Sequence, residues 1–195
     1  MDQQSEAEIV ARVLKGDSQA YALLVDEYKS PIYNLAYRLT KNLEDAEDLA
    51  QETFLRAFNQ LSLYDTKRSF YTWLYTISLN LIRNHLKKTS RHRQTNFSNG
   101  RVASGAVNSD GKEAFLHELP DDDEGCKERE EDLESCLRKL SPELRELLIL
   151  RFYQGLSFEA IAEITGFSIS AIKMRVYRGL EKLRKYIGMN VTSDG

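Results

Sequence analysis

The chain has 195 residues, of which 42% are hydrophobic and 29% are charged, and its formal net charge is -3. This composition is typical of a soluble globular protein, and the length suffices for one substantial core or two small ones. Ten glycines and three prolines are few for a turn-rich β-sandwich, whereas long segments repeat apolar residues at helical spacing. We therefore expect an all-α protein made of two small helical domains.

The termini and the rare residues exclude several classes of protein. The N-terminal segment MDQQSEAEIVARVLKGD lacks the basic start and apolar run of a signal peptide, and no stretch approaches the roughly 18 apolar residues of a membrane span. We expect a cytoplasmic protein with no direct membrane insertion. The only cysteines are Cys126 and Cys136, and neither they nor the three histidines have metal-ligand spacing. No metal, disulfide or cofactor is predicted.

Two helices are predicted before residue 43. Ser5 and Glu8 have the spacing of a capping box, which predicts the start of a short helix that Gly16 ends. Asp17 can cap a second helix. Pro31 lies inside that second helix and is expected to kink or split it, because proline lacks the amide donor of the helical ladder.

A third helix is predicted from Leu43 to Leu61, with one apolar and one acidic face. The apolar face is expected to comprise Ala46, Leu49, Ala50, Phe54, Ala57, Phe58 and Leu61. The opposite face carries Glu44, Glu47, Asp48, Gln51 and Glu52. Acidic residues near a helix N-terminus are stabilising on their own, so this face is either a solvated surface or a docking surface for a basic or polar partner.

The segment SFYTWLYTISLNLIRNHLKKTSRHR, residues 69–93, runs from aromatic residues into a basic tail. Between Thr66 and Ser109 there are eight basic residues and no acidic one, which predicts a local positive field that suits phosphates. Helical spacing places on one polar stripe Thr72, Thr76, Asn80, Arg83 and Lys87.

The aromatic residues of this segment suit an unpaired base, because stacking on a ring contributes about 1–3 kcal/mol and helps offset the cost of unstacking the base from a duplex. The candidates are Tyr64, Phe70, Tyr71, Trp73 and Tyr75. The alternative is a buried helix with a solvated basic end.

A linker is predicted at residues 96–130, between domains at residues 1–95 and 131–189. Its first half is rich in Ser, Asn and Gly, and from Asp110 to Glu134 twelve acidic residues face three basic ones. We expect a flexible acidic tether. A sharper alternative is a DNA mimic that occupies a basic channel until nucleic acid displaces it.

The second domain has the spacing of a helix-turn-helix. Ser141 and Pro142 open a helix that ends at Gly155 and carries Leu144, Leu147, Leu148 and Phe152. Ser157 caps a short helix, the turn is Thr165-Gly166-Phe167, and Ser168 caps a last helix to about Ile187.

The last helix is amphipathic and basic. Its expected buried stripe is Ile169, Ile172, Val176, Leu180 and Leu183, and its exposed side offers Ser170, Lys173, Met174, Arg175, Tyr177, Arg178 and Lys182. From Ser168 to Ile187 six basic residues face one acidic residue. This pattern predicts a helix that enters the DNA major groove, and the alternative is a helical hairpin with a basic surface.

Three segments, in this order, resemble a sigma factor of the sigma-70 family, of the small extracytoplasmic-function (ECF) type that keeps only regions 2 and 4. DAEDLAQETFLRAF (45–58) resembles the polymerase-binding segment, FYTWLYTISLNLIRNHL (70–86) the promoter-melting and minus-10 segments, and LSFEAIAEITGFSISAIKMRVYRGLEKLR (156–184) the minus-35 reader. The resemblance implies a subunit that initiates transcription, without catalytic residues or cofactor. Its implied partners are core RNA polymerase, promoter DNA and an anti-sigma factor.

The resemblance also implies which residues make the contacts. The polymerase-binding residues would be Asp45, Asp48, Gln51, Glu52, Phe54 and Leu55. The minus-10 residues would be Tyr64, Asp65, Lys67, Ser69, Tyr71, Trp73, Asn80, Arg83, Asn84, Lys87 and Lys88. The minus-35 residues would be Ser168, Ser170, Lys173, Met174, Arg175, Tyr177 and Arg178.

Two other functions fit parts of the pattern. A stand-alone helix-turn-helix regulator would use the same C-terminal reader as a dimer on palindromic sites, but it has no reason to carry the segment 45–58. A nucleic-acid enzyme needs a metal or carboxylate constellation, and the acids here are expected on outer helix faces or in the linker.

Overall fold

The computed structural model describes residues 2–98 and 133–191, and the regular structure in these two ranges is helical. The N-terminal unit (residues 2–98) contains α1 (Gln3–Leu14), η1 (Ser18–Ala20), α2 (Tyr21–Thr40), α3 (Leu43–Asn59), η2 (Leu61–Leu63) and α4 (Phe70–Ser98). The C-terminal unit (residues 133–191) contains a helix at 133–138, α6 (Pro142–Leu148), η3 (Ile149–Tyr153), α7 (Phe158–Thr165) and α8 (Ile169–Val191).

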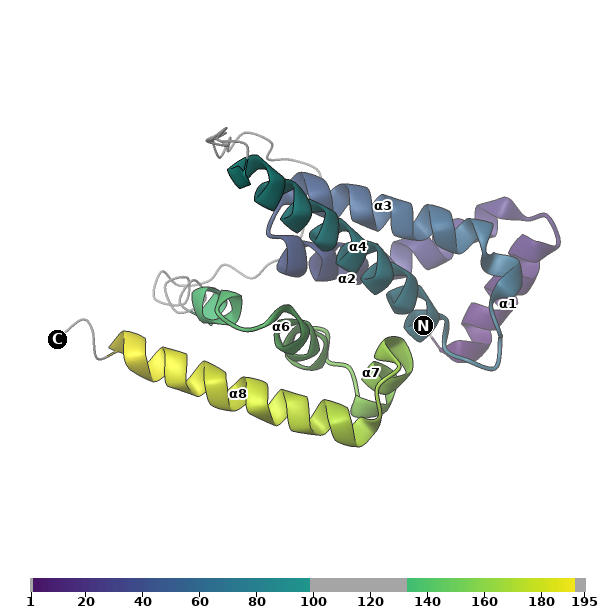
Figure 1. The fold of residues 1–195 in the computed structure, drawn as a ribbon. Coiled ribbons are helices and arrows are strands. Elements are labelled where there is room, and N and C mark those ends of the chain that lie inside the picture. The colour runs from purple at the N-terminus through teal and green to yellow at the C-terminus, as the bar shows by residue number, and fades with distance from the viewer. Residues whose placement is uncertain (1, 99–132, 192–195) are drawn as a thin grey trace, which may run out of the picture.

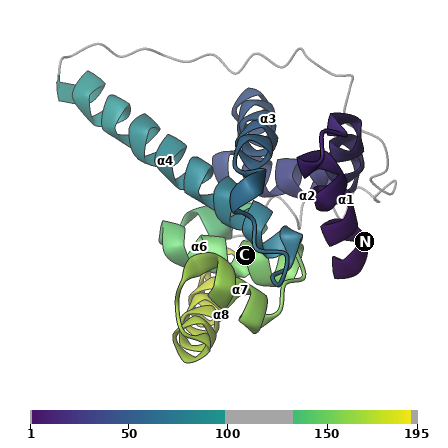
Figure 2. The ribbon, with the colours of Figure 1, turned by 90° about the vertical axis from the view of Figure 1, so that its right-hand side faces the viewer.

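The two units lie against one another: α6, η3 and α7 face α2 and α4, and α8 packs on α6 and α7 on the side away from the N-terminal unit (Figures 1 and 2). The expected all-α fold of two helical parts is confirmed. The acidic tether and its possible DNA mimicry, together with Cys126, fall on residues 99–132, which lie outside the described residues.

The N-terminal helices start at caps that are only partly those expected. Asp2, and not Ser5, caps α1, because its carboxylate accepts the Ser5 N–H at 2.8 Å, so the Ser5–Glu8 capping box is wrong. Asp17 caps the next turn as predicted, accepting the Ala20 N–H at 3.3 Å. Helix α2 is not split at Pro31, because buried residues on either side of the proline keep it packed against its neighbours.

The core of the N-terminal unit is formed by α2, α3 and α4. Its fully buried side chains include Leu24, Ile32, Leu35, Leu74, Leu79 and Ile82. The predicted apolar face of α3 is confirmed except at Phe58, which is 42% exposed and lies edge-on to the Tyr21 ring, 5.1 Å between centroids. Phe58 is near the end of α3, where fewer helices cover it.

Helix α4 is covered on more than one side. It packs on α2 and α3 within its own unit and on α7 of the other. For this reason Thr72 is buried and does not belong to the polar stripe, and its hydroxyl donates to the Ser69 carbonyl at 3.0 Å. The two-sided packing also buries Tyr75 completely.

The C-terminal unit contains the predicted helix-turn-helix. Ser157 accepts the Ala160 N–H at 3.1 Å at the start of α7, and Ser168 accepts the Ala171 N–H at 3.3 Å at the start of α8. Between them Gly166 adopts a φ of +75°, a left-handed conformation that favours glycine. The short helix, the glycine turn and the following helix are therefore where the sequence placed them.

Three apolar residues of this unit are more exposed than expected. The chain forms a π-turn at η3, with the Gln154 N–H bonded to the Ile149 carbonyl at 3.0 Å, and this wider turn rotates Phe152 out of the core to 56% exposure. Ile169 and Leu180 are also exposed, because α6 and α7 cover only the middle of the α8 stripe.

Polar contacts join the two units along α4. The Tyr75 hydroxyl donates to Gln154 Oε1 at 2.7 Å. About two turns beyond Tyr75 on α4, the Arg83 guanidinium makes a bidentate pair with Glu146, at 2.9 and 2.6 Å. This pair raises the pKa of Arg83, chiefly through the hydrogen bonds to Glu146.

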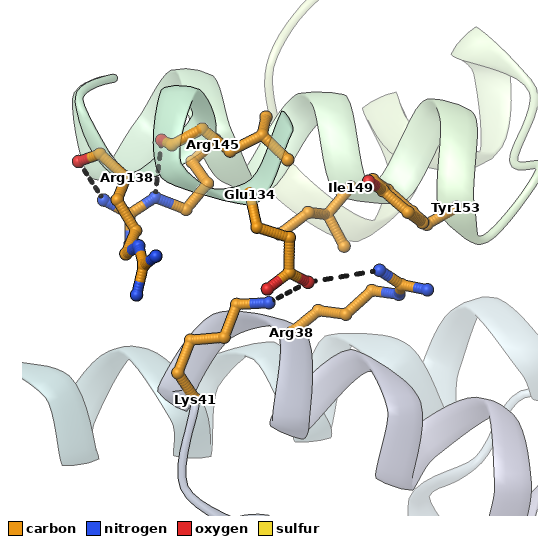
Figure 3. Close-up of a pocket in the computed structure, with 8 residues that line it drawn as sticks. Arg38, Lys41, Glu134, Arg138, Arg145, Ile149 and Tyr153 are labelled. Atoms are coloured by element: carbon orange, nitrogen blue, oxygen red, sulfur yellow. Dashed lines mark hydrogen bonds and ion pairs between the residues drawn. The ribbon is translucent and has the colours of Figure 1, made fainter. Parts of the chain in front are cut away.

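A second group of contacts joins the units at α2, around a small pocket (Figure 3). Glu134 forms ion pairs with Lys41 and with Arg38, the latter at 3.7 Å. The Arg38 guanidinium also lies 3.7 Å from the centroid of the Tyr153 ring. Ion pairs at partly exposed positions are screened by salt, so the strength of these contacts depends on ionic strength.

Replacing Gly166 by alanine is expected to lower the free energy of unfolding by about 1–2 kcal/mol, because a Cβ is strained at its positive φ. No atom lies within 4 Å of the position of that Cβ, so strain and not collision is the cause. Urea unfolding followed by circular dichroism measures the loss. Gly166→Asn should lose less, since asparagine tolerates this conformation, and equal losses in both variants would contradict the explanation.

The double variant Glu134→Gln/Glu146→Gln is expected to open the junction. Two half-buried ion pairs at about 1 kcal/mol each correspond to about a thirtyfold shift between closed and open forms. Small-angle X-ray scattering should show a larger radius of gyration. Glu181→Gln, which breaks an exposed pair with Lys185 within α8, is the control and should leave the radius unchanged. An unchanged radius in the double variant would mean that these pairs do not hold the units together.

Candidate nucleic-acid and protein interfaces

The outer surface of α3 combines acids with an exposed leucine. Asp48 and Gln51 are exposed, and Leu55 one turn later is 60% exposed. Glu52 is half-buried and pairs with Arg56 at 2.6 Å, a helical i,i+4 contact. We call Asp48, Gln51, Glu52 and Leu55 the α3 surface. It offers an apolar contact with acidic neighbours, which suits a protein partner with basic or polar groups.

Two other predicted members of this set have different surroundings. Asp45 lies 3.2 Å from His85 Nε2 of α4, and its own N–H is bound by the cap residue Asn42 at 2.9 Å. Phe54 is buried in the core and supports the α3 surface from beneath. The structure thus brings together the exposed residues and leaves Phe54 without surface area for direct contact.

The loop of residues 64–69 is a tied, exposed turn before α4. The Tyr64 hydroxyl donates to the Arg68 carbonyl across the loop at 2.5 Å, and burial raises the pKa of Tyr64 to about 12. The Asp65 carboxylate accepts the Lys67 N–H at 3.0 Å. Asp65 and Lys67 are exposed and Ser69 is half-buried. The loop therefore presents charged side chains on a backbone fixed from within.

Few of the candidate stacking aromatics are accessible. Phe70 and Tyr75 are fully buried and Tyr64 nearly so, because Tyr64 and Phe70 pack on each other inside the N-terminal unit and Tyr75 also contacts the C-terminal unit. Tyr71 and Trp73 are half-buried. Of the five candidate rings, a base can therefore reach only Tyr71 and Trp73.

The solvent side of α4 carries the remaining predicted minus-10 residues. Asn80, Asn84, Lys87 and Lys88 are exposed and follow one another along the helix. Arg83 lies among them but is occupied by Glu146 of the C-terminal unit. The positive surface is thus present, with one of its cations paired to the second half of the chain.

The start of α8 presents a basic and apolar surface. Its exposed members are Ser170, Lys173, Met174, Tyr177 and Arg178. The major groove of DNA admits one α-helix, so the start of α8 can lie in it with these side chains facing the bases. No contact with the N-terminal unit covers these side chains within the residues that the structure describes.

Arg175 and Ser168 are held differently from the rest of this set. The Arg175 guanidinium lies 4.0 Å from the centroid of the Phe167 ring, and its Nη1 atom is buried without a hydrogen-bond partner. The Ser168 hydroxyl is occupied as the cap of α8. Ser168 thus begins α8, and Arg175 is held against the ring of the turn residue Phe167.

The residues that join the units, and one buried acid, were not predicted from the sequence. Glu134, Glu146, Gln154 and Tyr153 contact the N-terminal unit, and Glu6 is buried within it. Helical periodicity cannot pair positions on separate units, so no local signal indicates the first four. Within the two described ranges, no cluster of His, Cys, Asp or Glu could hold a metal ion, and no helix has the length and apolarity to cross a membrane.

Comparisons with known proteins identify the family of this chain. The family model of sigma-70 region 2 matches residues 24–92, and that of sigma-70 region 4 matches residues 130–183. The ECF RNA polymerase sigma factor SigW of Bacillus subtilis is 33% identical over 182 residues, 91% of this chain and 94% of SigW. The RNA polymerase sigma-H factor of Pseudomonas aeruginosa is 32% identical over 192 residues, 95% of each chain.

Solved structures have the same fold. The sigma factor RpoE in complex with the anti-sigma factor NepR from Bartonella quintana superposes with a TM-score of 0.64 at 25% identity, covering 86% of this chain and 96% of that one. CnrH in complex with the cytosolic domain of CnrY has a TM-score of 0.68 at 22% identity, covering 96% and 99%. The two family matches and the full-length relatives show that this chain belongs to the sigma-70 family, as an ECF sigma factor that directs RNA polymerase to initiate transcription at promoters.

Proposed function

We propose that this sigma factor uses three separate surfaces: the α3 surface for core RNA polymerase, the loop of residues 64–69 with α4 for the minus-10 element, and the start of α8 for the minus-35 element. The observation that supports this most is that the three family-like segments fall on three different exposed surfaces. A regulator that acts alone would need only the last of them.

The polymerase contact rests on α3. Leu55 supplies the apolar area of a contact and Asp48 and Gln51 its polar rim, while Asp45 and Glu52 add negative charge. Such a surface suits a basic or polar partner, because complementary charge steers association and fixes its register. Phe54 supports it from the core.

The minus-10 contact rests on the loop and on α4. An unpaired base can stack on Trp73 or Tyr71, while Asp65, Lys67 and Ser69 line its approach. The strand continues along Asn80, Asn84, Lys87 and Lys88, whose charges and amides suit phosphates and base edges. Binding energy alone then stabilises the melted strand, with no bond chemistry, so the protein acts without being an enzyme.

The minus-35 contact rests on α8. Lys173, Tyr177 and Arg178 reach outward from the same side of the helix, with Ser170 and Met174 between them, and Arg175 is set by Phe167. The first turns of a recognition helix contact base edges, and the basic residues also grip phosphates. The domains would span residues 1–95 and 131–189, with the linker between them.

The closed arrangement of the units bears on how the protein is used. Arg83 can bind a phosphate only after it leaves Glu146, so minus-10 contact by Arg83 requires the units to separate. Two similar proteins have been solved with an anti-sigma factor or a cytosolic protein domain bound. We infer that an anti-sigma factor also holds this protein inactive, in the cytoplasm where polymerase works.

Asp48→Arg/Gln51→Ala is expected to weaken binding to core polymerase by about tenfold or more, because it places a positive charge where a basic or polar partner docks. Titration of labelled protein with core polymerase measures the affinity, and run-off transcription measures initiation. Glu8→Arg, an equal charge reversal on exposed α1, is the control and should behave as wild type. Sequence-specific duplex binding by wild type without core-dependent initiation would instead favour a stand-alone regulator.

Arg178→Ala is expected to weaken minus-35 binding by about 5- to 150-fold, the effect of losing one base or phosphate contact of about 1–3 kcal/mol. Run-off transcription should fall at mapped promoters while core affinity stays at the wild-type value. Lys185→Ala removes an equal charge about two turns further along α8, and it should change little. Equal losses in the two variants would point to nonspecific charge attraction.

A further inference from the structure

A buried carboxylate in α1 binds the start of α4. Glu6 is only 2% exposed, and it precedes residues 24–92, the segment that matches sigma-70 region 2. Its Oε1 atom accepts a hydrogen bond from the Tyr28 hydroxyl, and its Oε2 atom accepts the Phe70 N–H at 3.1 Å. A carboxylate withdrawn from water to this extent is costly unless such donors compensate it.

The bond from Phe70 to Glu6 gives an acceptor to an N–H group at the start of α4. Phe70 is the first residue of α4, and the first N–H groups of any helix have no acceptor inside it. The negative charge of Glu6 also lies at the positive end of the α4 dipole. Burial, followed by the bond to Glu6, raises the pKa of Tyr28, so its hydroxyl remains a donor.

The same helix α1 also reaches the loop that precedes α4. Gln3 Nε2 donates to the Thr66 carbonyl at 3.4 Å. At the other end of the loop the Ser69 carbonyl accepts the Thr72 hydroxyl at 3.0 Å. Together with the bond of Tyr64 to Arg68, these contacts fix the loop backbone at several points while residues 65–68 remain exposed.

We propose that Glu6 is a positioning residue for capture of the unpaired minus-10 base: from α1 it holds the N-terminus of α4, and with it the loop of residues 64–69, in the shape that receives the base. The inference rests on the minus-10 role proposed above for this loop. A loop that is ordered before it binds loses less conformational entropy on binding, so loss of this anchor weakens capture without touching the base.

The conservative variant for the test is Glu6→Gln. It keeps the size of the side chain, removes its charge and leaves an NH2 group facing one of the two donors. Tyr28→Phe is the milder variant, because it removes one hydroxyl from Glu6 and leaves the bond to Phe70. Thr53→Val is the matched control: Thr53 is fully buried in α3, and its hydroxyl donates to the Leu49 carbonyl at 2.6 Å, away from the loop.

The measurement uses the full chain with two probes. The first is amide hydrogen exchange over residues 64–72 of the free protein. The second is affinity for a 12-nucleotide non-template strand, taken from the minus-10 region of a promoter mapped with the wild-type protein, against a scrambled strand. Glu6→Gln should exchange faster over this segment and bind the strand about tenfold more weakly, and Tyr28→Phe should show a smaller loss. Core affinity and minus-35 duplex binding should stay within about twofold of wild type.

Several results would overturn the proposal. Wild-type affinity for the strand in Glu6→Gln, or in Tyr28→Phe if the former does not fold, would show that the anchor does not serve capture. An equal loss of affinity for the strand in Thr53→Val would show that the effect of Glu6→Gln comes from a general loss of stability. A wild-type protein that fails to distinguish the strand from its scrambled version would instead remove the minus-10 role of the loop itself, so the two failures are distinguishable.

Discussion

The packing of α4 is the constraint on which the rest of the structure depends. Leu74, Leu79 and Ile82 are fully buried against α2 and α3, while Tyr75 and Arg83 bond to the C-terminal unit. A helix covered from two directions keeps only a narrow solvent-facing strip, and the candidate minus-10 residues lie on that strip and on the loop at its start. The position of α4 thus decides which side chains nucleic acid can reach and how the two halves of the chain meet.

The junction between the units combines apolar packing with charged contacts. Helix α4 packs on α7, and beside this packing Arg83 pairs with Glu146, and Arg38 contacts Glu134 and Tyr153. A guanidinium binds a carboxylate or a phosphate with similar bidentate geometry, so a nucleic-acid backbone can take the place of Glu146. The C-terminal unit therefore pairs Arg83, a proposed DNA-binding residue, with a group of the same charge as DNA. In that proposal, separation of the units lets a phosphate replace the Glu146 carboxylate.

The sequence predicted what local chemistry determines. Ser157, Gly166 and Ser168 each act on residues within four positions, and periodicity alone placed most of the α3 core. Predictions were wrong where the outcome depended on distant neighbours. Whether Thr72 or Phe58 is covered depends on which helices arrive from elsewhere, and Glu6 has the sequence pattern of an ordinary surface glutamate, although its partner Phe70 lies 64 residues away. The roles of the candidate site residues remain predictions of the family resemblance, placed on surfaces that the fold supplies.

The π-turn at η3 links the register of one helix to the assembly of the whole chain. A π-turn holds one residue more than an α-turn, so the side chains after it are rotated relative to those before it. It is this rotation that turns Phe152 outward and aims Tyr153 and Gln154 at the N-terminal unit. Removal of one residue within 149–153 would restore a regular helix and redirect both contacts, while α7 and α8 kept their own caps. In evolution, a single-codon insertion or deletion at this turn could therefore set how tightly a sigma factor closes on itself, independently of the promoter that it reads.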